Sequence, residues 1–84
     1  MNGILIQQDF NGNHFLQIKN HFSENINIEL YNYLGCYIDK IFDGKIESNN
    51  LIIQIPNNNY AKGIYLLKIE NDKFIDIEKI MNIK

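Results

Sequence analysis

Three oxygen-bearing side chains alternate in the stretch DFNGNH, close to the start of the chain. Asp9, Asn11 and Asn13 have the spacing of the first three ligands of a calcium-binding loop. The sixth position of such a loop requires glycine for a sharp turn, but here it is His14, and the twelfth requires a bidentate glutamate, but here it is Asn20. A hairpin turn accounts for the same residues. We therefore expect no metal site, although these three residues come nearest to one.

The nucleophilic side chains are few and poorly placed for catalysis. Cys36 is the single cysteine, and Ser23 and Ser48 lie outside any G-x-S-x-G motif. His14 and His21, the possible bases, are distant in sequence from Cys36. One cysteine with two scattered histidines is also an incomplete set of zinc ligands. A lone cysteine is most often a small buried hydrophobic residue, and we expect that role here.

Asp76 and Glu78 form a close pair of carboxylates with a spacing that chemistry could use. Two residues apart on a strand, they share a face. Paired carboxylates serve acid–base catalysis only around a cleft that holds substrate. We expect them on the solvated face of a strand whose other face, with Ile75 and Ile77, packs in the core. The sequence thus predicts no enzyme and no cofactor.

The bulk composition argues against nucleic-acid binding and against a membrane-spanning segment. The formal charge is −2 and there is no arginine, whereas phosphate binding needs a basic surface. No apolar run approaches the roughly 20 residues that span a bilayer. The start MNGILIQQDF lacks the features of a signal peptide, so we expect any export signal on a longer parent chain. We therefore expect neither nucleic acid nor a membrane span.

The aromatic residues raise one further possibility, a surface that stacks on sugars. Five tyrosines are spread along the chain, at Tyr31, Tyr33, Tyr37, Tyr60 and Tyr65, without any tryptophan. The sequence shows no pairing of tyrosines on one outer face. We expect them to pack in the core and at its rim.

The elements that must position these residues are strands. Apolar and polar residues alternate with period two, as in INIELYNY, where Ile26, Ile28 and Leu30 share one face. Seven segments have this character: 4–8, 14–19, 26–33, 36–42, 51–55, 64–70 and 73–81. Turn residues separate them, at Asn11-Gly12, Leu34-Gly35, Asp43-Gly44, Pro56 and Asn71-Asp72. We predict one all-β domain, 1–84, an Ig-like antiparallel sandwich of two sheets, with a closed barrel as the alternative.

Three segments occur in an order that resembles a known family. They are NHFSENINIELYNYLG (20–35), AKGIYLLKIEND (61–72) and EKIMNIK (78–84). From Ile18 onward the chain resembles the type A C-terminal sorting domain of the type IX secretion system of Bacteroidetes, the Por secretion family. By this resemblance, residues 18–84 form the sorting domain. Residues 1–17 match no motif, and are a linker ordered as a hairpin or the end of the cargo.

The resemblance assigns signature positions at its start and middle. Asn20 and Phe22 stand where the family has the first and third residues of Asn-Pro-Phe, and His21 replaces the proline. Gly35 fits the turn glycine. Gly63 and Tyr65 fit the Gly-x-Tyr signature.

At the end of the chain, Lys79, Ile80 and Lys84 match the basic terminal signal of the family. In the strand before it, alternation places Tyr65, Leu67 and Ile69 on the inner face.

The resemblance implies a targeting device without chemistry of its own. Its implied partners are the outer-membrane secretion machinery, an upstream cargo domain, and a sortase-like peptidase that removes the sorting domain and joins the cargo to an anionic lipopolysaccharide. The implied location is the periplasm in transit, then the cell surface or the exterior. The alternative interpretation is an Ig- or fibronectin-like binding module of an adhesin or a carbohydrate-active enzyme.

Overall fold

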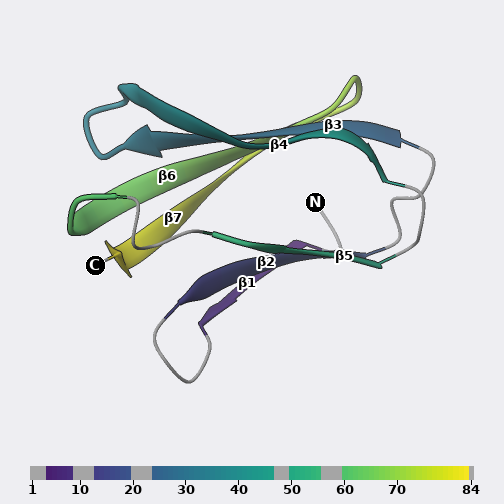
Figure 1. Ribbon diagram of the computed structural model, residues 1–84. Helices are drawn as coiled ribbons and strands as arrows, with labels where there is room; N and C mark the ends of the chain where they lie inside the picture. The colour runs from purple at the N-terminus through teal and green to yellow at the C-terminus, as the bar shows by residue number, and fades with distance from the viewer. Residues whose placement is uncertain (1–3, 9–12, 20–23, 47–49, 56–59, 84) are drawn as a thin grey trace.

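The computed structural model describes residues 4–8, 13–19, 24–46, 50–55 and 60–83. Two antiparallel sheets pack face to face (Figure 1). One has three strands in the order β1-β2-β5, with β1 at Ile4–Gln8, β2 at His14–Lys19 and β5 at Asn50–Gln54. The other has four strands in the order β4-β3-β6-β7, with β3 at Glu24–Asn32, β4 at Tyr37–Ile46, β6 at Gly63–Glu70 and β7 at Ile75–Ile83. The predicted sandwich of about seven strands is confirmed.

The described segments contain no helix, and hence none long and apolar enough to cross a membrane. The core lies between the two sheets. Alternate residues of β3 and β6 fill it, as the period-two pattern predicts: Ile26, Ile28 and Leu30 from one strand and Tyr65, Leu67 and Ile69 from the other. The remaining fully buried apolar residues are Leu16, Ile18, Ile46, Ile55 and Ile80.

The turn predicted at Asp43-Gly44 is wrong. These residues lie inside β4, where Asp43 pairs with Asn27 and Gly44 with Ile26, and the strand continues to the buried Ile46. The backbone pairing with β3 and the burial of Ile46 outweigh the local turn preference of an Asp-Gly pair. The turns at Leu34-Gly35 and Asn71-Asp72 are confirmed, whereas Asn11-Gly12 and Pro56 lie outside the described residues.

The faces of β7 are opposite to the prediction. Ile75 and Ile77 are 62% and 58% exposed on the outer side of the sheet, while Ile80 is 1% exposed in the core. Asp76 and Glu78 share the inner face with Ile80 and are half-buried. The terminal strand therefore places apolar side chains toward solvent and carboxylates toward the other sheet.

The hairpin turn before β7 explains this reversal. The side-chain oxygen of Asn71 accepts hydrogen bonds from the backbone N–H of Lys73 (2.8 Å) and of Phe74 (3.1 Å). This Asx turn fixes the loop length, so that Glu70 pairs with Ile75. Phe74, which packs against the core, and Ile80 have the same parity along the chain. Because Phe74 and Ile80 both pack inward, the residues of the other parity, Ile75 and Ile77, face solvent.

Two alanine variants of β7 test this register. We expect Ile80→Ala to lower the free energy of unfolding by about 2–5 kcal/mol, because it leaves a cavity in the core. Ile77→Ala removes the same atoms from an exposed position and should change it by less than about 0.5 kcal/mol. Urea denaturation of both variants measures the difference. A larger loss for Ile77→Ala would mean that the opposite face is buried.

Candidate recognition site

The terminal strand is an edge strand, and it carries two of the predicted signature residues. In the described part of the chain, β7 pairs with β6 alone. Ile80 lies opposite Tyr65 and is buried, while Lys79 lies opposite Leu66 and is exposed. Adjacent residues of the signature thus have different surroundings, because one faces the core and the other solvent.

The Gly63 and Tyr65 signature anchors the strand beside β7. Gly63 begins β6 and pairs with Ile83 of β7. The Tyr65 hydroxyl donates a hydrogen bond to the carbonyl oxygen of Ala61, and the ring lies 6.0 Å from that of Tyr60. Tyr60 in turn donates to an Asp39 carboxylate oxygen at 2.9 Å, and burial with this hydrogen bond raises the pKa of Tyr60 to about 12. This pair of rings closes the core at the end of the sandwich where β7 finishes.

Gly35 lies in a closely bonded hairpin tip, residues 33–36, between β3 and β4. Its φ of +88° is in the left-handed region that favours glycine. The side-chain oxygen of Asn32 accepts from the backbone N–H of Leu34 and of Cys36, both at 2.9 Å. The expectation of a buried Cys36 is wrong, because the cysteine lies in this hairpin tip and is exposed.

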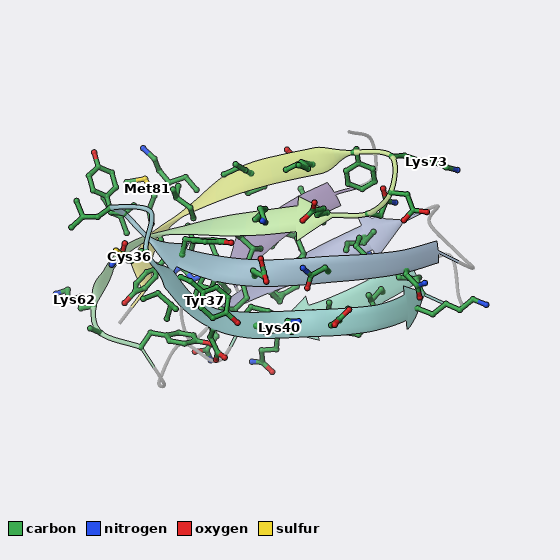
Figure 2. All side chains as sticks on the ribbon, turned by 90° about the horizontal axis from the view of Figure 1, so that it is seen from above. Cys36, Tyr37, Lys40, Lys62, Lys73 and Met81 are labelled. Atoms are coloured by element: carbon green, nitrogen blue, oxygen red, sulfur yellow. The ribbon has the colours of Figure 1, made fainter. Side chains whose placement is uncertain are left out.

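The hairpin tip and the end of β7 lie at the same end of the molecule. Asn32, Tyr65 and Ile80 form one row across the sheet, and the tip follows Asn32 directly. Figure 2 shows Cys36 and Met81 at this end, with Lys73 at the opposite end. The register thus brings the predicted Gly35, Tyr65, Lys79 and Ile80 to one end of the sheet. They come from the hairpin tip between β3 and β4, from β6 and from β7.

Two tyrosines pair on the outer face of the four-stranded sheet, against the expectation from sequence. The rings of Tyr31 and Tyr37 are 5.7 Å apart at 80°, edge to face. Lys68 Nζ lies 5.5 Å from the centre of the Tyr31 ring and forms ion pairs with Glu29 (3.4 Å) and Glu70 (3.6 Å). Perpendicular rings form no flat platform for a sugar, so this geometry does not favour carbohydrate stacking.

Glu29 is held in its charged form within this group. Burial alone would raise its pKa, but hydrogen bonds from Tyr31, Asn27 and Lys68 outweigh burial, and the pKa lies below its usual value. The Tyr31 hydroxyl donates to Glu29 at 3.0 Å. The centre of the outer face is therefore an ordered group of rings and compensated charges.

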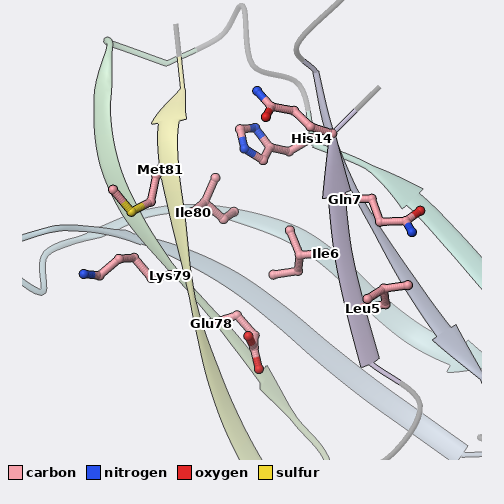
Figure 3. Close-up of a pocket in the computed structure, with 9 residues that line it drawn as sticks. Leu5, Ile6, Gln7, His14, Glu78, Lys79, Ile80 and Met81 are labelled. Carbon is pink, nitrogen blue, oxygen red and sulfur yellow. The ribbon is translucent and has the colours of Figure 1, made fainter. Parts of the chain in front are cut away.

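A hollow of about 480 Å³ separates the two edge strands β1 and β7 (Figure 3). Ile6 and Ile80 point toward each other across it, and Glu78 lines it beside them. Burial raises the pKa of Glu78, and the hydrogen bond and negative charge of Asp76 raise it further. Asp76 and Glu78 are thus neither the fully solvated pair that the sequence predicts nor part of an enclosed cleft.

The other sequence candidates are placed only in part. Asn13 directly precedes β2, whereas Asp9, Asn11, Asn20, Phe22 and Lys84 lie outside the described residues. Over the described ranges, no three His, Cys, Asp or Glu side chains gather as metal ligands would. Three residues of the outer face were not predicted as a site: the exposed Ile77 and the half-buried Tyr31 and Leu66. They come from three strands, and only the pairing register reveals that they are neighbours.

Two glycine variants test the hairpin tip. Gly35→Ala should lower the free energy of unfolding by about 1 kcal/mol, because alanine resists a positive φ even though nothing crowds its Cβ. Gly44→Ala is the control: its Cβ would meet the Phe42 ring at 3.6 Å, an ordinary contact within a strand. We expect the control to be neutral or stabilising by about 0.5 kcal/mol. If urea denaturation shows that both variants lose the same free energy of unfolding, the left-handed conformation of Gly35 would be contradicted.

The Glu78 carboxyl has a testable pH dependence. The pKa of Glu78 is raised in the folded state, so folding favours the protonated carboxyl. The stabilisation is therefore complete at pH values below the ordinary pKa of 4.5, and it is lost as the pH rises through the folded pKa. Glu78→Gln, a mimic of the protonated form, should therefore raise the melting temperature at pH 7 and have less effect at pH 4. Asp72→Asn in the exposed turn is the control. A lower melting temperature for Glu78→Gln at pH 7 would show that the charged form is preferred.

Comparison with known proteins identifies the domain. The family described as "Secretion system C-terminal sorting domain" matches residues 11–84, which starts ahead of Ile18, where the resemblance was expected to begin, and leaves β1 outside. The chain is also 33% identical over 73 residues to a tRNA(Ile)-lysidine synthase of Malacoplasma penetrans (strain HF-2). That match covers 87% of this chain but 23% of the relative, too little of the relative to carry its activity over. No solved structure matches significantly.

The match to the sorting family covers most of the chain and includes β7, in the terminal position that the sequence motifs predict. A domain of this family is a sorting signal, not a catalytic domain, and marks the protein that carries it for export to the cell surface or beyond. The chain therefore belongs to the family of secretion system C-terminal sorting domains, the signals of type IX secretion.

Proposed function

We propose that this domain carries an upstream cargo protein through the periplasm to the outer-membrane secretion machinery, which recognises it through β7. A sortase-like peptidase then separates the domain from the cargo. The observation that carries the proposal is the place of β7: it is the terminal strand of a matched sorting domain and also an edge strand of the larger sheet.

An edge strand offers a direct means of recognition. No second described strand pairs with the outer row of backbone N–H and C=O groups of β7. Main-chain hydrogen bonds from such a row bind extended segments in many complexes. Lys79 projects from the same strand as an exposed positive charge on a chain of net charge −2. Backbone, charge and strand position can be recognised together without an enclosed ligand pocket.

Deletion of Asp76–Lys84 from a fusion of the chain to a reporter enzyme tests the proposal. In a host with type IX machinery, we expect the truncated fusion to remain in the periplasm with full reporter activity, because the recognised strand is absent. Cell fractionation and surface protease treatment measure delivery. Normal surface delivery of the truncated fusion would contradict the proposal.

The deletion also removes Ile80 from the core, so it needs a matched variant. Ile80→Ala in the intact fusion loses the same core contact but keeps the strand and its edge. Below its melting temperature, this variant should still be delivered. If it is retained as completely as the deletion, loss of folding rather than loss of the strand would explain both results.

A further inference from the structure

The outer face of the four-stranded sheet carries several apolar side chains, here termed the outer patch. Its members come from three neighbouring strands: Tyr31 of β3, Leu66 of β6, and Ile75, Ile77 and Met81 of β7. A hollow of about 280 Å³ lies within it, lined by Tyr31, Gly35, Leu66, Lys68 and Ile77. The hairpin tip thus forms one wall of this hollow and β7 another.

The hairpin tip carries a further exposed apolar side chain. Leu34 is 83% exposed in a tip that four hydrogen bonds of 2.9 Å hold in place. Burying one large aliphatic side chain contributes about 1.5–3 kcal/mol, so a hydrogen-bonded loop that presents leucine to solvent leaves that contribution unused. Contiguous exposed apolar patches on soluble domains typically mark interaction sites.

The register of β7 makes the patch a feature of the fold and not an accident of composition. A shift of one residue would turn Ile75 and Ile77 into the core and Asp76 and Glu78 to solvent, but it would also expose Phe74 and Ile80 and bury Lys79. The Asx turn at Asn71, with Phe74 and Ile80, holds the other register. The same constraint that closes the core therefore keeps the patch on the surface.

Charge indicates what kind of surface the patch fits. Lys68 at its centre is compensated by Glu29 and Glu70. Lys79, between Ile77 and Met81 on the same face, is exposed, and no ion pair with another described residue involves it. A complementary surface would present an apolar projection to the hollow and a carboxylate to Lys79.

We infer that the outer patch is the docking surface for a protein component of the secretion machinery, one with an apolar ridge flanked by acidic side chains. The inference deepens the proposed function and rests on it. A hollow fits a projecting side chain, whereas the chain's net charge of −2 disfavours an anionic lipid surface. The partner would then contact β7 in two ways: through its backbone at the sheet edge and through its side chains on the outer face of the sheet.

Matched isoleucines on the two outer faces test the inference. Ile77 and Ile52 are 58% and 59% exposed, Ile77 in the outer patch and Ile52 on the three-stranded sheet. In the reporter fusion, Ile77→Asn should reduce surface delivery at least about tenfold, the effect of losing about 1.4 kcal/mol of binding. Ile52→Asn should remain within about twofold of the unmodified fusion. The melting temperatures of both variants confirm that they are folded.

A charge-reversal pair tests the acidic component. Lys79→Glu should reduce delivery, whereas Lys73→Glu, in the exposed turn at the opposite end of the sheet, should not (Figure 2). Equal delivery by all four variants would overturn the inference while leaving the proposed function intact. Retention of the unmodified fusion would instead remove the proposed function, and the inference with it.

Two physical measurements on the chain without its reporter test the alternative occupants of the outer patch, which are a second copy of the chain and a lipid membrane. If sedimentation shows a dimer that Ile77→Asn disperses, the patch is an interface between copies of this chain. If the chain floats with vesicles of phosphatidylcholine and phosphatidylglycerol and Ile77→Asn abolishes flotation, the occupant is a membrane. Either result overturns the inference, whereas a monomer that ignores the vesicles, with the delivery defects above, supports it.

Discussion

The pairing register between β6 and β7 decides which face of the terminal strand packs in the core. Tyr65 pairs with Ile80 and Ile69 with Asp76, which fixes one set of alternate β7 residues inward and the other outward. The four-residue turn bonded to Asn71 sets this register at one end of the hairpin, and the buried Ile80 holds it near the other. Since a strand has only two faces, this register decides which β7 side chains are buried and which face solvent.

The register separates two tasks that a terminal signal must perform. The inner face attaches the strand to the domain through Phe74 and Ile80, which pack in or against the core. The outer face, with Ile75, Ile77, Lys79 and Met81, remains available for recognition. The arrangement has a cost in stability, because Asp76 and Glu78 lie half-buried beside the hollow at β1 while two isoleucines face water. Such departures from the best local choice are expected where a surface serves a function.

Sequence alone predicts the positions of the strands well, because a period-two pattern depends on local alternation. It also predicts the buried faces of β3 and β6, where one set of alternate residues is uniformly apolar. It fails for β7 because both faces carry isoleucine, and alternation does not say which face turns inward. Phe74 and Ile80, with equal parity and large side chains, are the signal that could have decided it. The Asp43-Gly44 turn fails for a related reason: a local preference gives way to the pairing of β3 with β4.

The recognition site could be predicted only in part. The family resemblance directs attention to Gly35, Gly63, Tyr65, Lys79 and Ile80, and three-dimensional pairing then assigns them different physical settings. Tyr65 and Ile80 hold the strand, Gly35 shapes the tip, and Lys79 is exposed. Tyr31, Leu66 and Ile77 escape a sequence reading because their proximity arises from cross-strand pairs far apart in the chain.

Methyl NOE spectroscopy of the isoleucine-labelled chain can show directly whether β7 turns Ile80 inward and Ile77 outward. We expect NOEs from the Ile80 methyl groups to the Tyr65 ring and to Ile6, and from the Ile77 methyl groups to the Tyr31 ring. NOEs from Ile77 to Ile6, together with none from Ile80 to the Tyr65 ring, would show that the strand presents its other face to the core.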